Sequence, residues 1–145
     1  MDGFLFTTEV RVRFAETDAQ AIANNAVYLV WFETARVDYL ARFDGGYQGL
    51  RESGVEALTI EANVRYLQPA RFDDVLEIGV RCTELRGARF RFEYAVERAG
   101  ELLADGWTGH AAVEAATFRP TRVPDYLAEA IRAAEDATER ASWSG

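Results

Sequence analysis

Cysteine, histidine and lysine are scarce in this sequence, since 145 residues contain one cysteine, one histidine and no lysine. With Cys82 as the only cysteine, an intramolecular disulfide and a metal site built from several cysteines are both excluded. Its position within a predicted strand indicates a buried, inert thiol. No apolar run reaches the ~18 residues of a membrane-spanning helix, and the start lacks the pattern of a secretion signal, so we expect a cytoplasmic protein.

Basic charge is also in short supply. Sixteen basic residues, all arginine, stand against 24 acidic residues and give a net charge of −8. This balance argues against nucleic-acid binding and against docking on anionic membranes, because both need a basic excess. The rest is the composition of a soluble globular protein, 49% hydrophobic and 28% charged, in a chain long enough for a single domain over residues 1–145.

Periodicity and turn residues predict one long helix among strands. The predicted elements are a strand over residues 4–14, a helix over 25–42, a strand over 55–66, a hairpin of strands over 75–86 and 88–98, a strand over 101–118 and a peripheral helix over about 125–140. The helix over 25–42, with Asn24 or Asn25 as its N-cap, is apolar on almost every face, which is typical of a buried helix. We therefore expect an α+β fold in which a curved antiparallel sheet wraps around this helix.

Alternation predicts which strand residues share a face. In the strand over 55–66, one face is expected to carry Leu58, Ile60, Ala62, Val64 and Tyr66. In "RFRFEY", one face is expected to carry Phe90, Phe92 and Tyr94, and the other Arg89, Arg91 and Glu93.

A carboxylate precedes the long helix. Asp18 lies on a short polar loop that leads into the helix N-terminus, where unpaired N–H groups and the helix dipole favour negative charge. Such a residue is either a turn or capping aspartate, or a catalytic carboxylate beside N–H groups that polarise a carbonyl oxygen. Spacing alone does not separate the two interpretations.

Residues 16–36 resemble the signature of the 4-hydroxybenzoyl-CoA thioesterase-like branch of the hotdog-fold acyl-CoA thioesterases. The matching residues are Thr17, Asp18, Ala19, Asn24, Asn25, Tyr28, Phe32, Glu33, Ala35 and Arg36, followed by Tyr66, Pro69, Ala70 and Asp74. The order of elements agrees from about residue 6 to residue 118, so the resemblance covers most of the chain.

The resemblance implies a hotdog fold that hydrolyses an acyl-CoA thioester to a free acid and CoA, without a metal or bound cofactor. Asp18 would be catalytic, either as a nucleophile that forms an anhydride or as a general base on water. The backbone N–H groups of Asn25, Ala26, Val27 and Tyr28 would hold the oxyanion. A homodimer or homotetramer with the acyl site at the dimer interface is also implied, and the open edge of a single sheet independently favours dimerisation.

The sequence departs from the family pattern in the loop after Asp18. Ala21 stands where the family has glycine, and alanine tolerates a positive φ poorly, so either the loop bends differently or it does not need that conformation. Ile22 stands where many relatives have histidine. Ala23 replaces a larger aliphatic residue, which could enlarge the acyl pocket.

Other candidate residues have both a functional and a structural interpretation. Glu33 is the alternative catalytic carboxylate, but its spacing favours an ion pair with Arg36. Asp105 and His110 have the spacing of hotdog hydratases, but a separation of five within a strand places them on opposite faces.

Two arginines could contact the phosphates of CoA. Arg65 and Arg71 are the candidates, and ordinary cross-strand or solvated pairing is the alternative for both. Two other functions also remain open. One is a non-catalytic acyl-thioester binding protein, and the other is a thioesterase for acyl-carrier-protein substrates, which the acidic surface disfavours because carrier proteins are themselves acidic.

Overall fold

The computed structural model describes residue 1, residues 3–43 and residues 45–143. Its elements in chain order are β1 (Phe6–Arg11), a 3₁₀ turn η1 (Phe14–Glu16), α1 (Val27–Ala41), α2 (Gly46–Glu52), β2 (Val55–Tyr66), β3 (Val75–Arg86), β4 (Arg89–Arg98), β5 (Glu101–Glu114) and α3 (Asp125–Trp143). The predicted order of the strands and of the two long helices is confirmed, and α2 is a further short helix between α1 and β2. The last strand ends four residues before the predicted position 118, and α3 runs slightly beyond 140.

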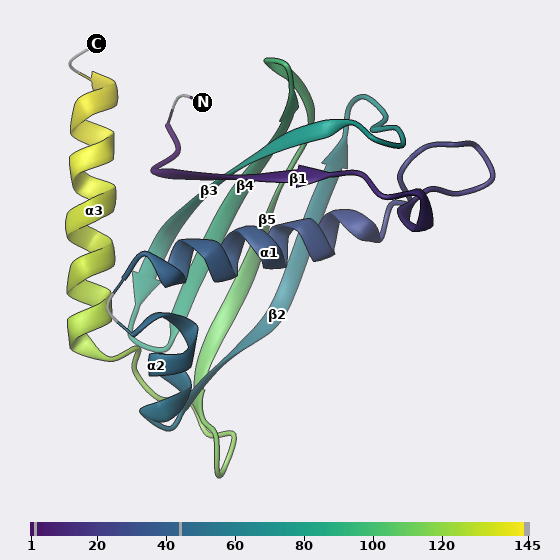
Figure 1. Ribbon diagram of the computed structural model, residues 1–145. Helices are drawn as coiled ribbons and strands as arrows, with labels where there is room; N and C mark the ends of the chain where they lie inside the picture. The colour runs from purple at the N-terminus through teal and green to yellow at the C-terminus, as the bar shows by residue number, and fades with distance from the viewer. Residues whose placement is uncertain (2, 44, 144–145) are drawn as a thin grey trace.

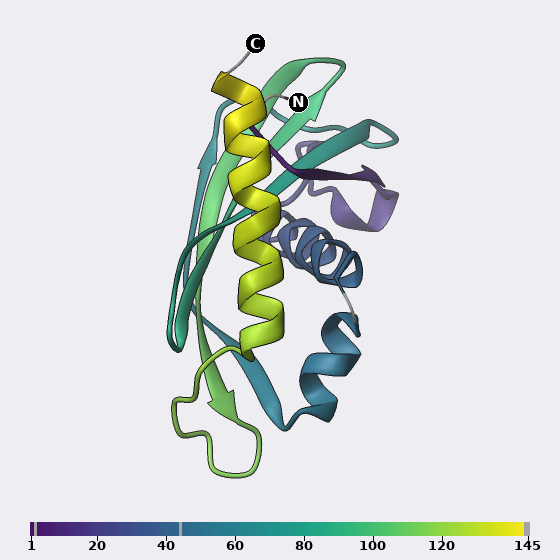
Figure 2. The ribbon, with the colours of Figure 1, turned by 90° about the vertical axis from the view of Figure 1, so that its left-hand side faces the viewer.

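The five strands form one antiparallel sheet in the order β1-β3-β4-β5-β2. The sheet curves, and α1 lies across its concave face (Figures 1 and 2). β1 forms one edge of the sheet, and the long strand β2 forms the other. This is the α+β hotdog arrangement expected from the sequence.

Close contact between α1 and the sheet depends on a glycine. The ring of Phe32 stacks on Tyr94 at 4.1 Å with an interplanar angle of 2°. A Cβ at Gly106 would lie 2.9 Å from the Phe32 ring and 2.2 Å from the Asn63 carbonyl oxygen. A larger residue at position 106 would therefore push the helix away from β5.

α1 is buried on one side only, so the expectation of burial on every face is wrong for the single chain. Tyr28, Trp31 and Phe32 are at most 3% exposed. On the opposite side, the apolar residues Leu29, Val30 and Val37 are 41%, 52% and 44% exposed. A sheet of five strands covers one face of a helix, and the apolar character of the other face needs another explanation.

The predicted face of β2 is also wrong in part, because the strand contains a bulge between Thr59 and Glu61. The extra residue, Ile60, lines a surface hollow on the convex side together with Trp107. Thr59 contacts the His110 ring, and Tyr66 packs against Tyr28 of α1. A bulge reverses the alternation, so Thr59 rather than Ile60 shares the α1 face with Tyr66.

The hairpin of β3 and β4 follows the prediction more closely. Phe92 and Tyr94 are 1% and 2% exposed and face α1, and Phe90 points the same way against His110. Arg81 pairs with Glu93 on the other face at 2.7 Å. Alternation was therefore a sound guide wherever the strand is regular.

α3 covers the part of β3 that β1 leaves unpaired. The last partner of β1 on this strand is Val80, opposite Phe6. Beyond that point the Glu135 carboxylate accepts a hydrogen bond from the Cys82 N–H at 2.9 Å, and Arg132 donates to the Leu85 carbonyl at 2.9 Å. The helix thus supplies hydrogen-bond partners for backbone groups of β3 that would otherwise be free to pair with a strand of another chain. Across the described residues, no helix combines the length and the apolar character needed to cross a bilayer.

Candidate active site

The loop that carries Asp18 is anchored to α1 by a buried glutamate. Glu16 is 8% exposed, and its carboxylate accepts hydrogen bonds from the Arg13 N–H at 2.8 Å and from the Trp31 indole N–H at 3.3 Å. Its carbonyl accepts from the Asn24 N–H at 2.8 Å. Sequence reasoning gave Glu16 no such role, because the contact joins residues fifteen positions apart. These bonds fix where the loop leaves and where it rejoins the helix.

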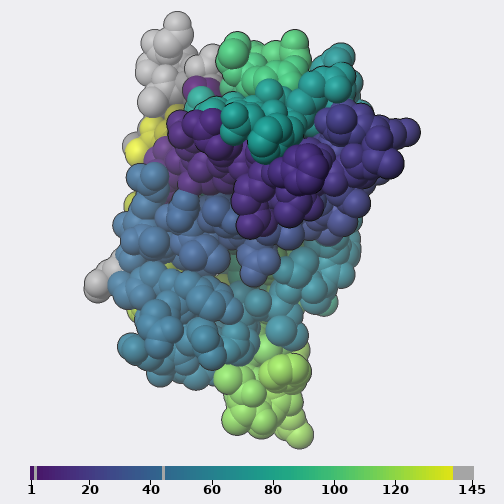
Figure 3. Space-filling view, turned by 45° about the vertical axis from the view of Figure 1, so that its right-hand side comes forward, coloured from purple at the N-terminus to yellow at the C-terminus, as the bar shows by residue number. Residues whose placement is uncertain are grey.

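Asp18 lies at the start of a tight turn and is exposed. Its N–H donates to the Ile22 carbonyl at 3.0 Å, and its Oδ1 accepts from the Gln20 N–H at 2.8 Å. Within the described chain, Oδ2 accepts no hydrogen bond. The residue is therefore a turn aspartate rather than a cap of α1, and one of its carboxylate oxygens has no hydrogen bond to the described residues. The loop projects from the body of the protein (Figures 1 and 3).

The loop keeps a left-handed turn at the position where the family has glycine. Ala21 has a φ of 63°, and its N–H donates to the Asp18 carbonyl at 2.9 Å. An alanine in this region costs about 1 kcal/mol relative to its ordinary conformations. The sequence left two alternatives open: a loop that bends differently, or a loop that does not need the left-handed conformation. Neither occurs, because Ala21 adopts the left-handed conformation despite its cost.

Neither predicted residue is the N-cap of α1, because that position is Ala26 and no side chain caps it. Asn24, one of the two predicted residues, instead closes the turn that leads into the helix. Its side-chain oxygen accepts from the Ala26 N–H at 2.9 Å, and its carbonyl accepts from the Val27 N–H at 3.0 Å. The N–H groups of Asn25 and Tyr28 donate to no carbonyl outside α1 and to no side chain in the described part of the chain. Of the four predicted oxyanion donors, two are thus engaged and two are open.

The two arginines proposed for CoA lie in different settings. Arg65 makes two hydrogen bonds to Asp105, at 3.1 and 2.7 Å, across the β2–β5 pair. Arg71 follows Ala70, whose carbonyl accepts from the Ala23 N–H at 2.8 Å, and its backbone bridges Ile22. Arg71 is therefore beside the Asp18 loop, whereas the guanidinium of Arg65 is already occupied.

Glu33 and Arg36 do not form the predicted ion pair. Arg36 instead donates to the Tyr94 hydroxyl at 3.1 Å, and no carboxylate among the described side chains lies within ion-pair distance of it. Both residues line a cavity of about 250 Å3, here called the α1 cavity. Its other lining residues are Val37, Leu40, Tyr47, Ala57, Thr59, Phe90, Phe92 and His110.

A chain of buried polar groups ends at this cavity. The Tyr94 hydroxyl lies 2.6 Å from Thr108 Oγ1, which lies 2.7 Å from Nε2 of His110. Burial and then the charge of Arg36 lower the pKa of His110 to about 3, so its imidazole is neutral near pH 7. Asp105 lies on the opposite face of β5 in its pair with Arg65, as predicted, so it cannot share a water with His110.

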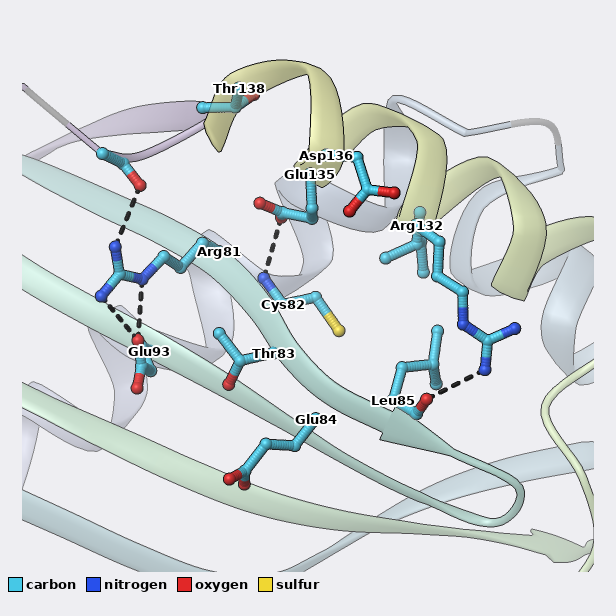
Figure 4. A pocket seen from close by; sticks show the side chains of 12 residues that line it. Arg81, Cys82, Thr83, Glu84, Leu85, Glu93, Arg132, Glu135, Asp136 and Thr138 are labelled. Atoms are coloured by element: carbon cyan, nitrogen blue, oxygen red, sulfur yellow. Dashed lines mark hydrogen bonds and ion pairs between the residues drawn. The ribbon is translucent and has the colours of Figure 1, made fainter. Parts of the chain in front are cut away.

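A larger cavity, of about 580 Å3, lies between α3 and β3 and is here called the α3 cavity (Figure 4). Its polar groups bond mainly to one another or to the sheet edge, as the Arg81–Glu93 pair and the Glu135 contact show. Cys82 is 6% exposed, which confirms the buried thiol expected from the sequence, and burial and then Glu135 raise the pKa of this thiol to about 12. No group of three or more metal-ligating side chains occurs in the part of the chain described.

Comparison with known proteins identifies the family. A sequence model of the thioesterase-like superfamily matches residues 12–131. The acyl-CoA thioester hydrolase YbgC of Escherichia coli O157:H7 is 33% identical over 103 residues, which are 71% of this chain and 77% of that protein. The acyl-CoA thioesterase YbgC of Haemophilus influenzae is 30% identical over 120 residues, 82% of this chain and 88% of that protein.

Solved structures agree. The structure of a Thermus thermophilus thioesterase complexed with coenzyme A and zinc matches with a TM-score of 0.81 at 33% identity, over 94% of this chain and 98% of the other. The resemblance inferred from residues 16–36 is thereby confirmed. The chain belongs to the thioesterase-like superfamily and has its hotdog fold.

Proposed function

We propose that this protein hydrolyses an acyl-CoA thioester to a free carboxylic acid and CoA, with Asp18 as the catalytic carboxylate. The observation that carries the proposal is the junction of loop and helix. Asp18 has a free Oδ2 on a turn that leads directly to α1, where the N–H groups of Asn25 and Tyr28 are open. A carboxylate and open N–H donors near it are what attack on a thioester carbonyl requires.

Two chemical roles suit Asp18. As a nucleophile, Oδ2 attacks the thioester carbon, CoA leaves as its thiolate, and water hydrolyses the resulting anhydride. As a general base, the carboxylate takes a proton from a water that attacks the same carbon. In both roles the N–H groups of Asn25 and Tyr28 hold the negative oxygen. Neither role uses a metal or a bound cofactor, and Arg71 beside the loop is the proposed contact for CoA phosphates.

The active unit is proposed to be a homodimer formed along the free edge of β2. Leu29, Val30 and Val37 expose apolar surface on α1, and residues 59–66 of β2 are exposed except for Val64. Antiparallel pairing of two copies buries both features at once. A homotetramer would be a pair of such dimers.

This pairing completes the site with parts of both copies. If the two β2 strands pair about the midpoint of residues 59–66, Tyr66 of one copy lies opposite Thr59 of the other. The Tyr66 hydroxyl donates to the Asn25 carbonyl at 2.7 Å and so marks the N-terminus of α1. Thr59 lines the α1 cavity. The Asp18 loop of one copy and the α1 cavity of the second copy are therefore proposed to form one active site.

Turnover of a panel of CoA thioesters tests the proposal. The Asp18→Asn variant is expected to lose about 100-fold or more in kcat/KM, because asparagine can neither attack nor accept a proton. Glu33→Gln is the matched control, and it is expected to keep most of the activity.

Three outcomes contradict the proposal in different ways. Full activity of Asp18→Asn with loss in Glu33→Gln would assign catalysis to Glu33. Binding of CoA thioesters without turnover would favour the non-catalytic binding protein. Turnover confined to acyl-carrier-protein thioesters would replace CoA as the substrate carrier.

A further inference from the structure

The backbone carbonyl of Asn25 is bonded to a side chain of the sheet rather than to α1. In a 3₁₀ or α turn, a carbonyl accepts from the N–H three or four residues further along the chain. For Asn25 these donors are Tyr28 and Leu29, but the Leu29 N–H goes to the Ala26 carbonyl at 3.3 Å, and the Tyr28 N–H makes no hydrogen bond among the described residues. The Asn25 carbonyl instead accepts from the Tyr66 hydroxyl of β2 at 2.7 Å.

Aromatic contacts hold the Tyr66 hydroxyl in this position. Its ring packs edge-on against Tyr28, with centroids 5.0 Å apart and an interplanar angle of 83°. The Tyr28 ring packs in turn on Trp31 at 4.7 Å, and the Trp31 indole N–H donates to the buried Glu16 carboxylate at 3.3 Å. Tyr66 therefore belongs to a connected set of side chains that joins the end of β2 to the start of α1 and to the loop before it.

The peptide unit between Asn25 and Ala26 is held on both sides. Its carbonyl accepts from Tyr66, and its N–H donates to the side-chain oxygen of Asn24 at 2.9 Å. Because a peptide unit is planar, two hydrogen bonds on opposite sides fix its orientation. In this orientation the Asn25 carbonyl does not reach the Tyr28 N–H, which stays open at the start of the helix.

We propose that Tyr66 is a positioning residue for thioester hydrolysis, because its hydroxyl holds the Asn25 carbonyl away from the Tyr28 N–H and so keeps that N–H available for the oxyanion. Without the hydroxyl, the Asn25 carbonyl turns back and accepts from Tyr28, and the transition state loses a donor. Tyr66 acts through the backbone of α1 rather than on the substrate itself. The inference rests on the proposed function and adds to it a residue of the edge strand β2.

The Tyr66→Phe variant tests the positioning role, because it removes the hydroxyl and keeps the ring that packs on Tyr28. With butyryl-CoA and benzoyl-CoA as substrates, kcat is expected to fall about 10- to 100-fold, somewhat less than the ~10²–10³-fold cost of deleting an oxyanion donor outright. KM is expected to stay within about twofold, since the donor acts on the negative oxygen of the transition state. Tyr126→Phe is the matched control. It removes an exposed hydroxyl of α3 that has no hydrogen bond in the described chain, and it is expected to leave both constants unchanged.

A vibrational measurement reports on the donor without turnover. Benzoyl-CoA with a carbon-13 label in its thioester carbonyl is bound to the Asp18→Asn protein, and the carbonyl stretching frequency is recorded by infrared difference spectroscopy. Hydrogen bonds from open N–H groups polarise the carbonyl, so its frequency is expected to lie below that of free benzoyl-CoA. Adding Tyr66→Phe is expected to move the frequency back towards the free value, which loss of ring packing alone would not do.

The results separate this inference from the proposed function. A kcat of Tyr66→Phe within about twofold of the wild type would overturn the positioning role while hydrolysis stands. Loss confined to Tyr66→Leu, which also removes the ring, would assign packing alone to Tyr66 and overturn the role as well. If the wild type hydrolyses no thioester, the proposed function fails, and the carbonyl frequency decides the inference on its own. A lowered frequency that Tyr66→Phe restores supports it, and an equal frequency in the two proteins, or no binding, overturns it.

Discussion

The α1 cavity and the α3 cavity differ in how far their polar groups are already paired within the protein. The α3 cavity is more than twice as large as the α1 cavity, at about 580 against 250 Å3. Its groups are largely committed: Glu135 accepts two hydrogen bonds, and Arg81 is paired with Glu93. The exception is the buried Thr83 hydroxyl, which has no partner in the described structure.

The α1 cavity has the opposite character. Arg36 lacks a carboxylate partner among the described side chains, and Thr59 makes only a long contact to His110. Polar groups with a structural role make their hydrogen bonds within the folded protein. Groups that bind a ligand keep unpaired donors or acceptors until the ligand is bound. Spare hydrogen-bonding capacity, rather than volume, therefore distinguishes a candidate binding site from a seam between a helix and a sheet edge.

The largest effect on this comparison is expected from Glu135→Ala in the α3 cavity. The change leaves the buried Tyr39 hydroxyl and the Cys82 N–H without their acceptor. Each orphaned group costs about 1–3 kcal/mol, so the free energy of unfolding is expected to fall by about 3 kcal/mol. Urea denaturation measures this loss, and kcat/KM of the folded variant is expected to stay unchanged.

Glu129→Ala is the control for this prediction, because Glu129 is exposed on the same helix. It is expected to leave stability unaltered. A Glu135→Ala protein that is as stable as the wild type but impaired in turnover would reverse the roles assigned to the two cavities.

A smaller effect concerns the stability contributed by His110 at low pH. Burial and the charge of Arg36 lower the pKa of His110 in the folded state to about 3, against ~6.5 in an unfolded chain. Between these values the unfolded state binds the proton and the folded state does not. Stability is therefore lost as pH falls from ~6.5 towards ~3, by about 2 kcal/mol at pH 5 relative to pH 7 from this group alone.

Urea unfolding at the two pH values measures the difference. The His110→Asn variant is expected to lose about 2 kcal/mol less than the wild type over the same interval, because asparagine does not titrate. Identical pH dependence in the two proteins would mean that folding does not lower the pKa of His110.

The fold could be predicted from the sequence wherever regular periodicity continued. The alternation of Phe90, Phe92 and Tyr94 correctly identified the inner face of β4, and the apolar helix correctly identified the centre of the fold. The bulge at Ile60 could not be predicted, because one extra residue leaves the local composition unchanged while it reverses the face. The exposed side of α1 could not be predicted either, since an apolar face does not reveal whether a sheet or a second chain covers it.

The candidate site also has a part that could be predicted from the sequence and a part that could not. The loop around Asp18 is continuous in sequence, so its residue pattern was visible, but the N-cap of α1 is Ala26 rather than Asn24 or Asn25. The chain from Arg36 through Tyr94 and Thr108 to His110 joins one helix and two strands. Its only sequence signal was that Tyr94 belonged to an inward face. The pairing register that brings these residues together follows from tertiary structure. The catalytic role of Asp18, the oxyanion donors and the CoA contacts stay predictions.

The most direct test of the central claim is complementation between two inactive variants. Asp18→Asn removes the catalytic carboxylate, and Ala57→Phe fills the α1 cavity, which Ala57 lines. Co-expression with two different tags and purification on both yields mixed dimers, and sedimentation first establishes that each variant alone is a folded dimer. If each active site consists of the Asp18 loop of one copy and the α1 cavity of the other, each mixed dimer contains one intact site. That site combines the unchanged Asp18 of one variant with the unfilled cavity of the other. Its kcat is then expected to return to about half that of the wild-type dimer. Mixed dimers that remain as inactive as their parents would contradict the account, because loop and cavity would then have to belong to the same copy.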